Sequence, residues 1–174
     1  VQLLGVTRDI TERKQLESAL RREGRRCREL LEALPAAVYV TDAAGYVTYC
    51  NQSAIELWGT PPKFGEDKWC DLASFHDRDG RPMNTADCPT EIALKLGRSV
   101  QGVEAILKRR DGTRVPILPC PTPLYDADGS VVGVVNMTLD LSERKKAELV
   151  LAERNMQLDL AGKVALVGTF GFDV

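Results

Sequence analysis

The stretch that decides the fold is Asp140-Leu141-Ser142-Glu143-Arg144-Lys145, and a near copy stands towards the other end of the chain, Asp9-Ile10-Thr11-Glu12-Arg13-Lys14. Each copy follows a short apolar run that contains Gly-Val, and each opens a long charged segment with helical spacing. We therefore expect a strand to pass into a helix twice. Such a duplication at long range is typical of a tandem array of similar modules.

The duplication divides the chain into parts. Residues 35–141 are predicted to form one complete module between two connecting helices, at residues 10–34 and 142–166. Residues 1–9 are interpreted as the last strand of a preceding module, and residues 167–174 as the first strand of a following one. The chain is thus expected to be a piece of a longer protein.

The composition indicates an ordinary globular protein. Hydrophobic residues make up 44% of the 174 residues and the formal net charge is −2, so nothing in the charge balance requires nucleic acid. No apolar run reaches the roughly 18 residues that a membrane span needs, and no signal peptide is visible. We expect a cytoplasmic fragment without direct membrane contact, from a parent protein that could itself be membrane-attached.

The cysteines and the single histidine give no pattern of a metal site or an active site. The five cysteines are odd in number, widely spaced and without a Cys-x-x-Cys pair, which favours free thiols. The separations of Cys70, His76 and Cys88 match no standard zinc spacing, and no second histidine can serve as a base for a thiol nucleophile. The sequence therefore predicts neither a metal nor thiol catalysis.

Residues 10–34 have the pattern of an amphipathic helix. Leu16, Leu20, Leu30 and Leu34 fall close to a heptad seam, and Pro35 ends the pattern. Arginines and glutamates cover the other faces, as in the solvated flank of a coiled coil. This seam predicts that the chain forms a homodimer.

The central module reads as strands interrupted by short helices. Residues 37–50 predict a β-hairpin, Asn51 can cap a helix that Gly59 ends, and a second helix is expected from Pro89 to Leu96. Three further strands follow, joined by turns that contain Asp-Gly. The fold class is therefore α+β, with a five-stranded antiparallel sheet and helices packed on one face.

One predicted strand carries alternating prolines. Pro119, Pro121 and Pro123 would all lack an N–H group on the same side of the strand. If the strand lies between two others, one of its two ladders must be broken along this stretch while the other survives.

These segments together resemble the PAS sensory family with its C-terminal extension, PAC. The matching stretches are residues 30–35, residues 40–47, Asn51-Gln52-Ser53-Ala54, Arg110-Asp111-Gly112-Thr113 and residues 140–145. Residues 87–104 look like a subtype frequent in bacterial multi-PAS sensor histidine kinases. The resemblance implies the PAS fold and a module for signal input and dimerisation, whose final strand and outgoing helix feed a downstream kinase or cyclase.

The resemblance also defines which cofactors to look for. Haem-binding relatives carry a histidine on the helix that corresponds to residues 89–96, and none is present there. Flavin-photosensing relatives use a cysteine within Asn-Cys-Arg-Phe and a glutamine on the last strand, where this chain has Thr138. We therefore predict no haem or flavin, which leaves an unknown small ligand as the open alternative.

A ligand pocket can still form between the sheet and the helices. Asn136 and Thr138 lie on the same face of the last strand, and Tyr39, Trp58 and Trp69 can supply aromatic walls. Simpler alternative roles are core packing for Trp58 and contact with solvent or a partner for Asn136.

The junction of strand and helix at residue 140 is the candidate for signal relay. Asp140 and Glu143 have the spacing of a capping box, and Arg144 lies four residues after Asp140, within reach of an ion pair. A helix cap alone explains these residues; the resemblance adds that the corner transmits the signal.

We therefore expect a homodimeric sensory PAS module of a bacterial multi-PAS protein, with a histidine kinase as the output. Its other partners are the neighbouring PAS and output domains of the same chain. No nucleotide-binding glycine motif is present, so the fragment is not expected to be an enzyme. The alternatives are a diguanylate cyclase output, a ligand-free oligomerisation spacer and, more distantly, an enzyme that uses Cys and His.

Overall fold

An antiparallel sheet with six strands, in the order β2-β1-β6-β5-β4-β3, forms the body of the molecule. The computed structural model describes the backbone of residues 2–169 and the side chains of residues 13–158 and 160. The strands are β1 (Ala37–Asp42), β2 (Val47–Cys50), β3 (Ser74–His76), β4 (Ala105–Lys108), β5 (Arg114–Tyr125) and β6 (Val131–Asp140). The prediction of five strands is corrected by β3, which pairs with β4 at the edge. Three residues among prolines and glycines are too few to show an alternating pattern.

Two short helices and two 3-10 turns lie against one face of this sheet. The helices are α2 (Gln52–Trp58) and α3 (Pro89–Leu96), and the turns are η1 (Trp69–Asp71) and η2 (Thr85–Asp87). Helix α2 ends at Gly59, whose φ of 75° is left-handed, and α3 starts with a proline, as the sequence predicts. Leu57, Trp58 and Ala93 on these helices pack into the core.

Asn51 fixes the point where three elements meet. Its Oδ1 accepts the N–H groups of Val38 and Ala54, at 2.9 and 3.0 Å, which caps α2 and ties it to β1. Its Nδ2 donates to the carbonyls of Leu31 and Ala36, at 3.0 and 2.9 Å. The side chain is fully buried and fully paired, so its burial leaves no polar atom unsatisfied.

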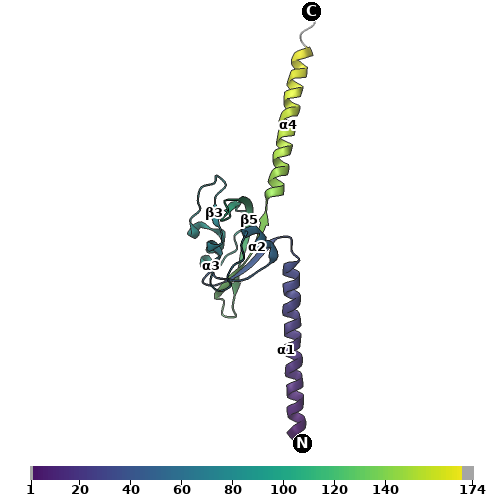
Figure 1. Ribbon diagram of the computed structural model, residues 1–174, viewed down its shortest axis with the longest axis vertical. Helices are drawn as coiled ribbons and strands as arrows, with labels where there is room; N and C mark the ends of the chain where they lie inside the picture. The colour runs from purple at the N-terminus through teal and green to yellow at the C-terminus, as the bar shows by residue number, and fades with distance from the viewer. Residues whose placement is uncertain (1, 170–174) are drawn as a thin grey trace, which may run out of the picture.

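The long helices α1 (Gln2–Glu32) and α4 (Ser142–Thr169) leave the domain in opposite directions (Figure 1). Residues 2–9 and 167–169 are therefore helical, which corrects the predicted end strands there, while residues 1 and 170–174 lie outside the described backbone. Within the described backbone neither segment pairs with a strand, and a helix satisfies its own hydrogen bonds. No described helix is long and apolar enough to cross a membrane.

The alternating prolines interrupt one ladder of β5, as predicted. Strand β5 pairs with β6 from Ile117 to Tyr125, but its pairing with β4 stops at Ile117. Beyond that point the carbonyl of Pro121 accepts the N–H of Val100 at 3.2 Å, on the side away from β6. Each of the three prolines lacks its N–H on that side, so the regular ladder with β4 cannot continue.

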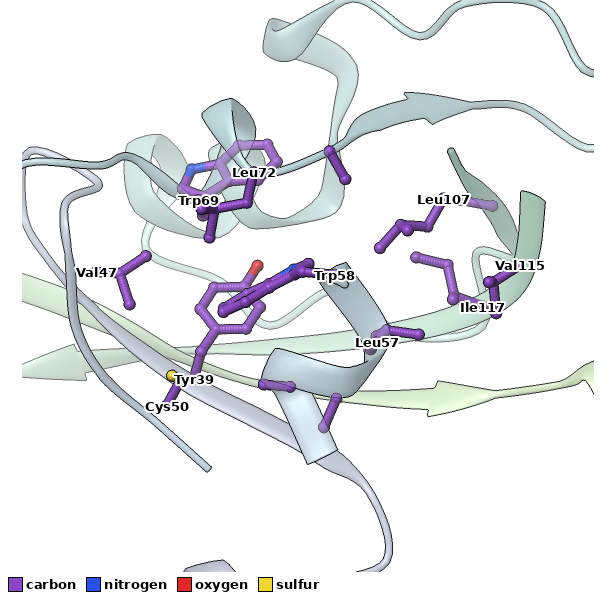
Figure 2. Close-up of a cluster of buried hydrophobic side chains, with 14 of the residues drawn as sticks. Tyr39, Val47, Cys50, Leu57, Trp58, Trp69, Leu72, Leu107, Val115 and Ile117 are labelled. Carbon is purple, nitrogen blue, oxygen red and sulfur yellow. The ribbon is translucent and has the colours of Figure 1, made fainter. Parts of the chain in front are cut away.

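Strands β1 and β6 approach closely at Gly133. A Cβ atom at this position would lie 2.0 Å from the carbonyl oxygen of Thr41, so only glycine fits without moving the strands. Strands β1 and β6 pair from Ala37 with Thr138 to Asp42 with Gly133. Figure 2 shows the core around Tyr39 of β1 and Trp58 of α2.

Candidate functional site

A small cavity lies in the core between the sheet and the helices. All the ligand-pocket candidates from the sequence line it: Tyr39, Trp58, Trp69, Asn136 and Thr138. Its free volume is about 20 Å³, close to what one water molecule needs. The structure therefore brings the candidates together around a space that a larger ligand would have to widen.

A buried polar trio crosses this cavity from the sheet to α3. Asn136 Nδ2 donates to the hydroxyl of Tyr39 at 2.9 Å and to the hydroxyl of Thr90 at 3.1 Å, and the two hydroxyl oxygens lie 3.0 Å apart. Asn136 Oδ1 accepts the N–H of Cys120 at 3.0 Å. Asn136 thus faces the core, and its alternative role in contact with solvent is wrong.

Thr90 is the member of the trio that the sequence analysis missed. It follows Pro89 in the first turn of α3 and shares a helix face with the buried Ala93. A hydroxyl on the apolar face of a predicted helix was the available signal.

Aromatic rings form the wall beside the trio. The centroids of the Tyr39 and Trp58 rings are 5.2 Å apart, and Figure 2 shows the two rings lying together in the centre of the core. The Trp69 ring packs against Phe75 with centroids 5.4 Å apart. Burial raises the pKa of Tyr39 to about 12, so its hydroxyl is neutral and can donate as well as accept.

Two buried residues of the cavity wall also line a groove on the outside of the domain. Leu57 and Thr138 line both the cavity and a surface groove of about 350 Å³, which Asp140 borders as well. Arg109 holds the end of α2 at this groove, since its guanidinium donates to the carbonyls of Leu57 and Glu56 at 2.9 and 2.8 Å. The wall between cavity and groove therefore adjoins the start of α4.

The thiols of Cys50 and Cys88 in the core are protonated and therefore weakly reactive. Burial raises the pKa of Cys88, which lines the cavity, to about 12, and that of Cys50 to about 11. Both are protonated at neutral pH, and protonated thiols are poor nucleophiles and poor metal ligands. In the described part of the chain, His, Cys, Asp and Glu side chains form no group of three that could hold a metal.

The junction between β6 and α4 at residues 140–145, called the exit corner below, does not form the predicted capping box. Asp140 Oδ1 accepts the N–H of Ser142 at 2.7 Å, whereas Glu143 pairs with Lys146 and Arg144 with Glu148, each at 2.8 Å. Helix α4 starts at Ser142, so Asp140 lies one position before the N-cap and Glu143 one position too early to complete a box. The predicted ion pair between Asp140 and Arg144 is therefore absent.

The corner is instead anchored to the domain by its backbone and by Lys145. Leu141 is buried, and its N–H donates to the carbonyl of Pro116 at 2.8 Å. Lys145 Nζ lies 2.9 Å from a carboxylate oxygen of Glu104. Sequence reasoning missed this pair because its members lie on different elements.

A family model for the PAS fold matches residues 31–146. The chain belongs to the PAS family. Its PAS domain is similar to solved PAS domains of Colwellia psychrerythraea (TM-score 0.53, 17% identity, 68% of this chain and 97% of that chain) and of an HTR-like protein from Haloarcula marismortui (0.52, 20%, 73% and 98%). At these identities the likeness shows the fold alone.

The PAS chain is also similar to parts of longer signalling proteins. It is 30% identical to the probable diguanylate cyclase DgcE of Escherichia coli, over 83% of this chain and 13% of that protein. It is 27% identical to the sensor protein FixL of Bradyrhizobium diazoefficiens, over 95% and 32%. It is 35% identical to two-component system protein A of Emericella nidulans, over 64% and 16%. The chain thus spans only 13% to 32% of the length of these relatives.

In this PAS domain one strand joins the cavity to the corner. Asn136 and Thr138 on β6 face the cavity, and Asp140, of the same parity, ends the strand where α4 is about to begin. A PAS domain is a sensory module without catalysis of its own. The cavity residues of β6 lie in the second half of the strand, within four residues of the end where α4 is about to begin.

Proposed function

We propose that this PAS domain senses a small molecule in its cavity and passes the change through β6 to α4, within a bacterial signal-transduction protein. A multi-PAS sensor histidine kinase is the proposed parent, supported by the similarity to a sensor protein and to a two-component protein. A diguanylate cyclase output is the second candidate, favoured by the similarity to DgcE.

The observation that carries the proposal is that one hydroxyl hydrogen of the polar trio has no acceptor among the three side chains. Asn136 Nδ2 donates one hydrogen to each hydroxyl, and either the Tyr39 or the Thr90 hydroxyl donates to the other. The remaining hydroxyl hydrogen has no acceptor within the trio. A buried donor without a partner is costly, so a ligand that brings an oxygen acceptor into the cavity would be stabilised there.

This geometry defines the chemistry of the ligand. The walls are aromatic and aliphatic, and the trio offers a neutral hydroxyl, so a small uncharged molecule with a carbonyl or hydroxyl oxygen fits best. Such a ligand must displace the wall to enter, and Leu57 and Thr138 are the residues that separate the cavity from the outer groove. Entry at this point would move β6 next to Asp140.

A second copy of the chain is the proposed partner, together with the neighbouring PAS and output domains of the same protein. Leu20 and Leu30 on α1 are each 63% exposed in the single chain, and Leu151 and Leu158 on α4 are also exposed. Exposed leucines at this spacing are stabilised when two helices pack together. Contact with nucleic acid or with a membrane forms no part of the proposal.

Native mass spectrometry and a visible absorption spectrum of the purified protein test the ligand. We expect a small uncoloured molecule bound to the wild type, retained in Thr122→Val and lost or weakened in Thr90→Val. Both variants exchange a hydroxyl for a methyl group, but Thr122 is exposed on β5 and Thr90 lies in the trio. An unmodified mass for the wild type would favour a ligand-free spacer, and a haem or flavin band would replace the proposed ligand class.

A further inference from the structure

Glu104 is a partly buried carboxylate on the segment between α3 and β4. Its side chain is only 18% exposed, and its Oε2 lies 2.9 Å from Nζ of Lys145 in the first turn of α4. The same oxygen lies 3.7 Å from Nε of Arg78, in the loop that follows β3. Three segments that are distant in sequence therefore meet at one carboxylate.

Helix α4 has few other attachments to the domain. Leu141, just before its first residue, is buried and bonds to Pro116, which forms a pivot. The described ion pairs of Arg144 and Lys146 join residues within α4 itself. The contact between Lys145 and Glu104 is thus the one described ion pair that can fix the direction of α4 about this pivot.

Glu104 is also next to the wall of the cavity. Ala105, its chain neighbour, is buried and lines the cavity, while Glu104 reaches outward to α4. Phe75 and Met83, on either side of the loop that carries Arg78, line the cavity too. Movement of this wall therefore displaces both the carboxylate and its second partner.

We propose that Glu104 is a positioning residue for α4, which sets the direction of the outgoing helix and links it to the cavity wall formed by Phe75, Met83 and Ala105. This link runs through β4 and the loop after β3, separately from the route along β6. The inference rests on the proposed function only in taking the direction of α4 as the output.

The electrostatics of the site support an ionised carboxylate. The hydrogen bond from Lys145, and the charges of Lys145, Arg78 and Arg144, hold the pKa of Glu104 below its ordinary value. Glu104 is partly buried and Lys145 is half exposed, so water screens part of their attraction, and the role of the pair rests on its geometry.

Hydrogen–deuterium exchange of this chain, followed by peptide mass spectrometry, tests the link. In Glu104→Gln we expect roughly two- to tenfold faster exchange in two places, residues 145–149 of α4 and residues 99–105. Lys145→Gln should produce the same change in residues 145–149, and the double variant should change these residues no further. Lys145→Arg should keep the wild-type rates. The melting temperature should change little in any of these variants.

Glu148→Gln is the matched control. It breaks the ion pair between Arg144 Nε and Glu148 Oε1, which has a similar length of 2.8 Å and lies wholly within α4. It should affect α4 alone and leave residues 99–105 unchanged. If Glu104→Gln behaves like Glu148→Gln, or if the Glu104 and Lys145 substitutions add fully, the positioning role is refuted.

Output of the full-length parent separates this inference from the proposed function. A change in basal output in Glu104→Gln but not in Glu148→Gln supports both. If Glu104→Gln alters the hydrogen exchange but not the output of the parent, Glu104 still positions α4. The direction of α4 would then not control the output, which counts against the proposed function.

Discussion

Two asparagines, Asn51 and Asn136, occupy core positions where an apolar side chain would leave backbone groups unpaired. Asn51 satisfies four backbone groups at the junction of α1, β1 and α2, and Asn136 satisfies the N–H of Cys120. A buried polar group that loses its partner costs about 1–3 kcal/mol. Both residues are therefore structural, and Asn136 adds a polar contact to the cavity.

At the residue scale, Tyr39 should make stability depend on alkaline pH. Burial raises the pKa of its hydroxyl to about 12 in the folded protein, against about 10 in an unfolded chain. Between these values the folded state holds more protons, so its stability falls as the pH rises, by at most about 1.4 kcal/mol per pH unit. Tyr39→Phe should flatten this decline.

Urea unfolding of both proteins at several pH values between 9 and 12 measures the effect. Tyr49, whose pKa is also raised to about 12 by desolvation and by Glu32, is present in both proteins and contributes equally. Tyr39→Phe should be less stable than wild type at pH 8, because Asn136 loses an acceptor. Parallel pH profiles would contradict the assignment of Tyr39.

At the element scale, β5 shows how a sequence can prevent backbone pairing on one side of a strand and keep it on the other. Prolines at alternate positions remove donors only towards the gap beside β4, while the intervening residues keep theirs towards β6. The pattern was readable in advance because it follows from proline chemistry and the two-residue period of a strand. Strand β3 was missed because it has no such pattern.

The one-sided ladder predicts unequal effects of neighbouring substitutions. Pro121→Val adds an N–H on the interrupted side and keeps a similar volume, so it should change the free energy of unfolding by less than about 1.5 kcal/mol. Thr122→Pro removes a donor to β6 and should cost at least about 1–3 kcal/mol. Urea denaturation compares them, and equal losses would show that both ladders matter there.

The exit corner shows where sequence spacing stops being informative. Asp140, Glu143 and Arg144 have the right separations for a cap and an ion pair, yet each binds a different partner, because the helix begins at Ser142. Spacing predicts which residues are near one another along a helix. It does not predict the contact between Lys145 and Glu104, which depends on how the helix packs against the domain.

At the scale of the whole molecule, the sequence predicted five of the six strands of the antiparallel sheet, the two short helices and five of the residues around the cavity. It could not predict the volume of the cavity or the inclusion of Thr90, because both depend on how α3 packs on β5 and β6. Residues 2–9 and 167–169, which were predicted as end strands, form helix instead. A strand needs a partner strand, and within the described backbone none lies beside these residues.

The long helices predict the assembly. In Leu20→Asp with Leu30→Asp, charges would replace apolar residues on the predicted seam of α1, so a dimer should dissociate. Ser18→Asp with Arg25→Asp places two aspartates on the opposite face of the helix and should leave the dimer intact. Light scattering after gel filtration gives the mass of each, and an unchanged mass in the leucine variant would contradict dimerisation through α1.

The interrupted ladder of β5 also bears on how such a domain avoids misfolding. In a protein with several similar modules, strands of one module can pair with those of the next while the chain is still folding. A strand edge that lacks three N–H groups cannot template a regular foreign ladder, so β5 accepts a full partner only along β6. We therefore expect that replacing Pro119, Pro121 and Pro123 would increase aggregation during refolding even where the native stability is preserved.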